Sequence, residues 1–150
     1  MKKYKYRLET LLKVKSQKEK EKQREHAEAL RKVYEQKERL TQIDSRRRDN
    51  LGRQRQVQEG GKFSVVDMLF YTRYFLKLKR ETLAGGELLR GLQRKSEEKR
   101  QALVRAAKER KIYEKLKEKQ KKKYDDEMET AEKKELDEIA TNSFYFNRRK

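Results

Sequence analysis

The sequence contains no proline and no cysteine, and it has only six glycines and no long apolar run. Without cysteine there is no disulfide framework, no thiolate nucleophile and no cysteine-based zinc site. Without proline, no residue forces a helix to stop. No segment approaches the roughly 18 consecutive apolar residues that cross a bilayer. The basic residues 1–7 are followed by no signal-peptide apolar region, so we expect a soluble cytoplasmic protein with no transmembrane segment.

What the chain does contain favours long helices. Of its 150 residues 47% are charged, with 44 Lys and Arg against 26 Asp and Glu and a net charge of +18. Leu, Ala, Glu, Lys and Arg dominate, a bias typical of long helices and coiled coils rather than of disorder. The hydrophobic share of 33% is too small for a globular core but suits a narrow seam between two helices. The basic excess favours acidic protein surfaces, nucleic acid or anionic membrane.

A loose heptad repeat predicts a first helix over about 4–58. Its two seam positions recur every seven residues, and fewer than half of them are apolar, which makes a weak, partly wet seam. One position holds Lys5, Leu12, Glu19, His26, Val33, Leu40, Arg47 and Gln54; the other holds Leu8, Lys15, Lys22, Ala29, Gln36, Ile43, Asn50 and Val57.

Adjacent glycines predict a turn over about 59–63, at Gly60 and Gly61. Ser64, with Asp67 three residues later, has the form of a capping box that begins a second helix over about 64–140. Two long helices joined by a tight turn pack antiparallel, with Tyr4 near Glu118. We therefore expect an all-α fold, an antiparallel coiled coil of two long helices, forming a single domain over 1–150 with a frayed tail at 141–150.

A second glycine cluster, Gly85, Gly86 and Gly91, weakens the second helix, since each glycine costs about 1 kcal/mol against alanine. The cluster is consistent with a bend or a local unwinding inside a continuous helix. The alternative is two separate helices and a three-helix bundle.

The densest apolar stretch, residues 65–83, does not fit on one helix face. One stripe is the expected seam: Val65, Met68, Leu69, Phe75, Leu76 and Leu83. The nearly opposite side holds Phe70, Tyr71, Tyr74 and Leu78. This second set either packs on a third helix or a homodimer mate, or forms an exposed docking patch for a partner.

Everything past about Glu118 is expected to project beyond the first helix. Tyr124, Met128, Leu136 and Ile139 would then form an amphipathic stripe without an intramolecular partner. Such a stripe can serve as a ligand for a groove or a ring lumen.

Nothing in the sequence indicates catalysis or a cofactor. His26 is the only histidine and lies at a seam position, so a paired-histidine metal site is excluded and a structural role is expected. The acidic clusters at 125–127 and 137–138 could hold a hard cation, but on an exposed helix such groups are ordinary surface charge. The glycine pairs match no phosphate loop. We expect no enzyme activity, no metal and no cofactor.

Basic runs at 46–48 and 121–123 are consistent with a solvated face or with contacts to a phosphate backbone. No zinc-finger, RNP or basic-zipper pattern accompanies them, so sequence-specific reading of nucleic acid is not expected.

Three segments stand out together: the opening YKYRLETLLKV at 4–14, the stretch RQALVRAAKERKIYEKLKEK at 100–119 and the closing LDEIA at 136–140. In this order they resemble the flagellar export protein FliJ family. The length, the two-helix layout and the tyrosine-rich start of the second helix also fit. The family departs from this sequence in commonly having phenylalanine at the positions of Tyr4 and Tyr6.

The resemblance implies a cytoplasmic component of the flagellar type III export apparatus, similar to the stalk subunit of rotary ATPases and peripheral to the inner membrane at the flagellar base. It implies three partners: the hexameric export ATPase, the export gate membrane protein and the export chaperones. The aromatic patch is then a candidate for the gate or a chaperone. The candidate ATPase contacts lie at the ends of the coiled coil: Leu8, Leu11, Leu12, Leu116, Leu136, Asp137, Glu138 and Ala140.

Two other classes remain open. One is a basic coiled coil associated with nucleic acid or the ribosome, which steep salt dependence of RNA binding would favour. The other is a single α-helix spacer, which a buried heptad seam would exclude.

Overall fold

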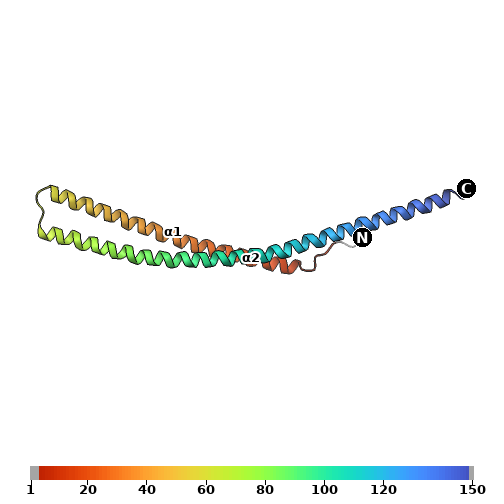
Figure 1. Ribbon diagram of the computed structural model, residues 1–150, viewed down its shortest axis with the longest axis horizontal. Helices are drawn as coiled ribbons and strands as arrows, with labels where there is room; N and C mark the ends of the chain where they lie inside the picture. The colour runs from red at the N-terminus through yellow and green to blue at the C-terminus, as the bar shows by residue number, and fades with distance from the viewer. Residues whose placement is uncertain (1–3, 149–150) are drawn as a thin grey trace. The chain divides into compact units, whose positions relative to one another are not determined.

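The computed structural model describes residues 4–148, and its regular secondary structure over this range is two α-helices with no strand. Helix α1 spans Glu9–Glu59 and helix α2 spans Val65–Asn147 (Figure 1). The two helices pack against each other, which confirms the predicted all-α fold of two long helices. Because α2 is continuous through Gly85, Gly86 and Gly91, the alternative of a three-helix bundle is wrong.

The turn between the helices forms where the glycine pair predicts it. Gly61 has a φ of +74°, a conformation that side chains with a Cβ rarely adopt. Ser64 Oγ accepts a hydrogen bond from the Asp67 backbone N–H at 3.2 Å, and the Asp67 carboxylate accepts one from the Ser64 N–H at 3.1 Å. This reciprocal pair is the predicted capping box and fixes the start of α2.

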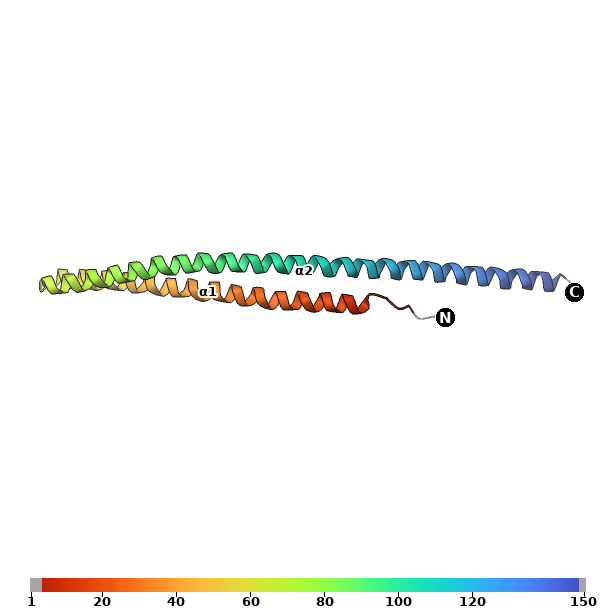
Figure 2. The same cartoon turned by 90° about the horizontal axis from the view of Figure 1, so that it is seen from below.

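The chain divides into two compact units, and both helices contribute to each. Residues 20–104 form the hairpin unit, and the described residues up to Glu19 and from Arg105 onward form the terminal unit. In the hairpin unit α1 and α2 run antiparallel and side by side, joined by the turn, as both views show (Figures 1 and 2). In the terminal unit the segment from Tyr4 to Tyr6 lies along α2.

The predicted seam of α1 is confirmed. Every member of the two heptad positions from Leu8 onward is buried or half-buried, whereas Lys5, which precedes the helix, is exposed. Val33, Gln36 and Asn50 are its fully buried members. The seam is therefore as polar as the sequence indicates, and the single-helix spacer is excluded.

The predicted seam of α2 is wrong. Of that stripe only Phe75 is half-buried, and the rest are exposed: Val65, Met68, Leu69, Leu76 and Leu83. The helix instead turns a different heptad series toward α1, every member of which is buried or half-buried: Tyr71, Leu78, Gly85, Leu92, Phe75, Thr82, Leu89 and Ser96. This series faces α1 because its members continue opposite the α1 seam along the hairpin unit. The outer stripe, in contrast, ends at Leu83.

Gly85 explains why the observed series is preferred. A Cβ at this position would lie 2.7 Å from Leu40 Cδ2 and 3.1 Å from Gln36 Nε2. The missing side chain lets α1 approach closely, and the buried Gln36 amide donates to the Gly85 carbonyl at 3.1 Å. Gly85 thus serves helix packing inside a continuous helix.

In the terminal unit the first residues are not helical, so α1 begins at Glu9 rather than at Tyr4. Tyr6 is only 5% exposed, and its hydroxyl donates to the Tyr113 carbonyl at 3.0 Å. The Tyr4 hydroxyl donates to the Lys117 carbonyl at 3.2 Å, one residue from the predicted neighbour Glu118. These contacts with α2 hold the segment and account for the later helix start.

Helix α2 runs farther than expected, because 141–147 are helical where the sequence predicts a frayed tail. Thr141 Oγ1 donates to the Asp137 carbonyl at 2.7 Å in this last stretch. Arg149 and Lys150, the end of the predicted tail, lie outside the described residues.

Candidate partner-binding surfaces

The aromatic docking patch predicted on α2 is not one outward surface. Phe70 is 68% exposed, but Leu78 is 1% exposed and is the most buried large side chain of the described residues. Tyr71 and Tyr74 are half-buried against α1. The prediction that Leu78 belongs to an exposed patch is therefore wrong, because the α2 face that carries it is the true seam.

Three of the four patch residues still share a surface. Phe70, Tyr71 and Tyr74 line a groove of about 280 Å³ in the hairpin unit, opposite four polar residues of α1: Arg46, Asp49, Asn50 and Arg53. The Phe70 and Tyr71 rings meet edge to face, with centroids 5.9 Å apart. Asn50 Nδ2 lies 3.4 Å from the Tyr71 carbonyl. Guanidinium groups beside aromatic faces suit a partner that presents carboxylate and aromatic side chains.

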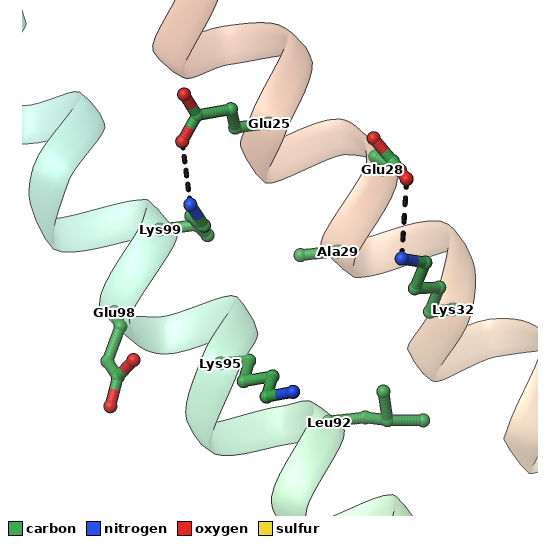
Figure 3. Close-up of a pocket in the computed structure, with 8 residues that line it drawn as sticks. All are labelled: Glu25, Glu28, Ala29, Lys32, Leu92, Lys95, Glu98 and Lys99. Atoms are coloured by element: carbon green, nitrogen blue, oxygen red, sulfur yellow. Dashed lines mark hydrogen bonds and ion pairs between the residues drawn. The ribbon is translucent and has the colours of Figure 1, made fainter.

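A second groove of about 410 Å³ lies between the helices farther along the hairpin unit, where small Ala29 faces Leu92. Figure 3 shows charged side chains closing its rim, with Glu25 bonded to Lys99 across the helices and Glu28 to Lys32 within α1. The Lys99 ammonium, 2.7 Å away, holds the pKa of the Glu25 carboxyl below its usual value, and Lys22 adds to this effect. Four of the six charged residues at the rim thus pair with one another, and the pair between Glu25 and Lys99 joins the two helices.

Ion pairs also join the helices in the terminal unit. Lys15 Nζ lies 2.8 Å from Glu109 Oε2, and Lys117 Nζ lies 2.6 Å from Glu9 Oε2. The hydrogen bond to Glu109 raises the pKa of Lys15. Arg110 pairs with both Glu19 and Glu114.

The candidate ATPase contacts fall into two groups. Leu8, Leu11 and Leu12 are half-buried, and Leu116 is 40% exposed. The closing group, residues 136–140, lies farther along α2 and is exposed throughout, with Leu136 65% exposed. The structure places both groups in the terminal unit.

The predicted C-terminal stripe changes character along α2. Tyr124 is half-buried and its ring lies 5.5 Å from the Tyr4 ring, and Met128 is also half-buried. From residue 129 to 148 every residue is exposed, including Ile139, Phe144 and Phe146. The unpartnered stripe therefore begins after Met128 rather than at Tyr124.

Residues 4–148 contain neither a group of metal ligands nor a membrane-spanning segment. No three His, Asp or Glu side chains in this range are grouped so that they could hold a metal ion. Neither described helix has a segment long and apolar enough to cross a membrane.

Sequence reasoning missed the outer face at the start of α2. Val65, Val66, Met68, Leu69 and Phe70 are all more than half exposed. The signal was present, since Leu69, Leu76 and Leu83 follow one another at intervals of seven and so share a face. The sequence nevertheless predicts this face as the seam, because apolar residues are expected to point inward.

Comparison with known proteins gives one match. The family model described as the flagellar FliJ protein matches residues 4–149, nearly the whole chain. Searches of curated proteins and of solved structures each found no match. The match covers all three segments that carry the sequence resemblance, and the chain therefore belongs to the FliJ family of flagellar proteins.

Proposed function

We propose that this chain is a stalk-like regulator of the flagellar type III export apparatus, which binds the hexameric export ATPase and links it to the export gate and to substrate chaperones. Family membership makes it a component of that apparatus. The ATPase, gate and chaperone contacts are our inference, as is the absence of catalytic activity of its own.

One observation carries the ATPase contact. Every residue of α2 from 129 onward, and Arg148 after it, is exposed, including the apolar residues. Leu136 and Ile139 lie one turn apart on this helix and face solvent. An amphipathic helix without an intramolecular partner is suited to a groove or the lumen of a ring. We therefore assign the main ATPase contact to Leu136, Asp137, Glu138 and Ala140, with Leu116 and the half-buried Leu8, Leu11 and Leu12 supporting it.

The gate or chaperone contact is assigned to the groove of Phe70, Tyr71 and Tyr74. Leu78 has no part in it, because it is buried between the helices. Arg46 and Arg53 on the other side of the groove favour an acidic partner segment. We propose that residues 1–150 act as one coiled-coil domain, since α1 and α2 both contribute to both units, and that it works peripherally at the cytoplasmic face of the membrane at the flagellar base.

The test is ATP turnover by the export ATPase of the same organism, titrated with the full chain at about 0.15 M salt. Saturable stimulation is expected, and it should be lost in the variant Leu136→Ser with Ile139→Ser. The matched control is Leu83→Ser, because Leu83 is 64% exposed and lies in the hairpin unit. Polylysine controls for simple charge effects, because the chain carries a net charge of +18.

No stimulation and no co-sedimentation with the ATPase would overturn the proposal. Equal loss in the Leu83 variant would show that the effect is not specific to the end of α2. RNA binding that is steeply salt-dependent and leaves ATP turnover unchanged would instead favour a nucleic-acid-associated coiled coil.

A further inference from the structure

The outer face at the start of α2 exposes apolar side chains at adjacent positions. Val65 and Val66 are 75% and 74% exposed, and Met68, Leu69 and Phe70 follow directly. Leu69 lies nine residues before the buried Leu78, which places it about 180° around the helix and directly away from α1. This surface, Val65, Val66, Met68, Leu69 and Phe70, is called the apolar tip below. It is separate from the interhelical groove except at Phe70.

The width of the apolar tip distinguishes between possible occupants. At about 100° of rotation per residue, Met68 to Phe70 span roughly 200° of the helix circumference. A packed partner helix typically covers a stripe on the order of 100° wide. A single helix would therefore leave part of the tip in water, whereas a fluid surface that surrounds the tip would cover all of it.

Charge around the tip is mostly positive. Residues 62–80 contain five cations, all exposed, and one acid. The cations are Lys62, Arg73, Lys77, Lys79 and Arg80. The acid, Asp67, is half-buried and its carboxylate accepts hydrogen bonds from the Ser64 N–H and hydroxyl. Any surface that receives the tip must supply negative charge beside it.

Lys79 favours lipid over a second helix. It lies between Leu76 and Leu83 on the outer face, at the spacing where a partner helix would bury it. A charge buried there without a partner is costly. At a lipid surface the same side chain can extend to the headgroups while its methylene groups stay in contact with apolar atoms.

We propose that the apolar tip and the cations beside it dock this protein on an anionic lipid surface, with the tip in the interface and the ammonium and guanidinium groups among the headgroup phosphates. Basic helices with aliphatic and aromatic residues on the other face bind such interfaces in this way. The inference deepens the peripheral membrane location in the proposed function, but the docking needs neither the export ATPase nor the gate, so each can fail without the other.

The experiment uses a tryptophan probe, because the chain has no tryptophan of its own. The full-length variant Leu69→Trp is mixed with vesicles of phosphatidylglycerol and phosphatidylethanolamine, and with phosphatidylcholine vesicles as the neutral control. On anionic vesicles we expect a blue-shifted emission and quenching by brominated acyl chains. The matched probe, Leu136→Trp, lies on an equally unpartnered helix face and is expected to show neither change.

Partitioning of side-chain variants separates insertion from simple charge attraction, which a chain of net charge +18 shows toward any anionic surface. Val66→Ser with Leu69→Ser should weaken binding to anionic vesicles about tenfold at about 0.3 M salt, where attraction between exposed charges is largely screened. The pair Leu136→Ser with Ile139→Ser should leave it unchanged. Circular dichroism checks that both variants stay helical.

Three results would overturn the inference. They are no quenching of the Leu69→Trp probe, equal quenching of both probes, and equal partitioning of the two double-serine variants. A blue shift of the Leu69→Trp probe with a synthetic Glu-rich amphipathic peptide, and none with vesicles, would assign the tip to an acidic protein helix. Each result leaves the ATP turnover test unaffected, since the vesicles contain no export protein.

Discussion

The backbone of Gly85 lies against the side chain of Leu40, so closely that a Cβ on residue 85 would stand 2.7 Å from Leu40 Cδ2. At Gly86, one residue later, a Cβ would meet no atom within 4 Å. Two adjacent glycines in one helix thus have different roles. Gly85 permits close packing of α1 on α2, whereas Gly86 faces away from any such contact.

Substituting the two glycines in turn should therefore give opposite results. Gly86→Ala should raise the free energy of unfolding by about 0.5–1 kcal/mol, because alanine favours the helix and has room. Gly85→Ala gains the same helix preference but forces Leu40 and Gln36 aside, and overpacking of this kind costs about 1–3 kcal/mol. Urea titration followed by circular dichroism measures both variants.

Gly91→Ala serves as the control, since a Cβ there also meets nothing within 4 Å and the variant should behave like Gly86→Ala. If Gly85→Ala were stabilised as much as Gly86→Ala, the close approach of the helices at this point would be wrong.

The assignment of the α2 seam can be tested with two leucines two residues apart. Leu78 is almost fully buried, so Leu78→Ala should lower the free energy of unfolding by about 2–5 kcal/mol. Leu76 is exposed on the outer face, so Leu76→Ala should change it by less than about 0.5 kcal/mol. Thermal unfolding monitored by circular dichroism would compare them, and a larger loss for Leu76→Ala would restore the seam that the sequence first predicts.

These two leucines also show how far the sequence could predict the fold. The heptad of α1 is predicted correctly because no competing apolar stripe exists on that helix, although fewer than half of its seam positions are apolar. On α2 two stripes compete, and the one that holds Leu69, Leu76 and Leu83 is the more apolar. The more apolar face is therefore the wrong choice for the seam. The correct choice depends on a glycine, whose packing role is visible only once α1 lies opposite it.

The surfaces were predicted less well than the fold for the same reason. Rotating the seam of α2 moves Leu78 inward and leaves Leu69 outside, so the expected docking patch and the expected core exchange members. The end of α2 does not depend on this choice, because no second helix accompanies it. The exposure of Leu136 and Ile139 could thus be predicted from register alone.

The contact between the buried Tyr6 side chain and α2 should weaken in alkaline solution. Burial is the main cause that raises the pKa of its hydroxyl above the ordinary 10.0, with the nearby Tyr4 adding to it. A raised pKa in the folded state means that the stabilisation is fully present below about pH 10 and is lost as the pH rises through the folded value. The stability of the wild type should therefore fall relative to Tyr6→Phe above pH 10.

At neutral pH the wild type is expected to be more stable than Tyr6→Phe. Tyr6→Phe loses the hydrogen bond to the Tyr113 carbonyl, so trypsin should cleave near Lys5 and Arg7 faster in this variant than in the wild type. The control is Tyr34→Phe, because Tyr34 is exposed on α1. Unchanged cleavage in Tyr6→Phe, or equal acceleration in the control, would contradict the contact.

Acid should loosen the hairpin unit through Glu25. Its carboxylate accepts hydrogen bonds from Lys99 of α2 at 2.7 Å and from Lys22 of its own helix at 2.9 Å, and the bond to Lys99 is the main cause that lowers its pKa below the ordinary 4.5. A lowered pKa in the folded state means that the stabilisation is present above pH 4.5 and is lost as the pH falls through the folded value. Glu25→Gln should therefore reduce the slope of stability against pH between about pH 5 and 3, measured by urea unfolding at each pH.

Glu129→Gln is the matched control for Glu25→Gln, because Glu129 pairs with Lys133 of the same helix. Its slope should stay close to that of the wild type, since exposed pairs within one helix contribute little, and identical slopes for both variants would show that the bond between Glu25 and Lys99 does not hold the helices together.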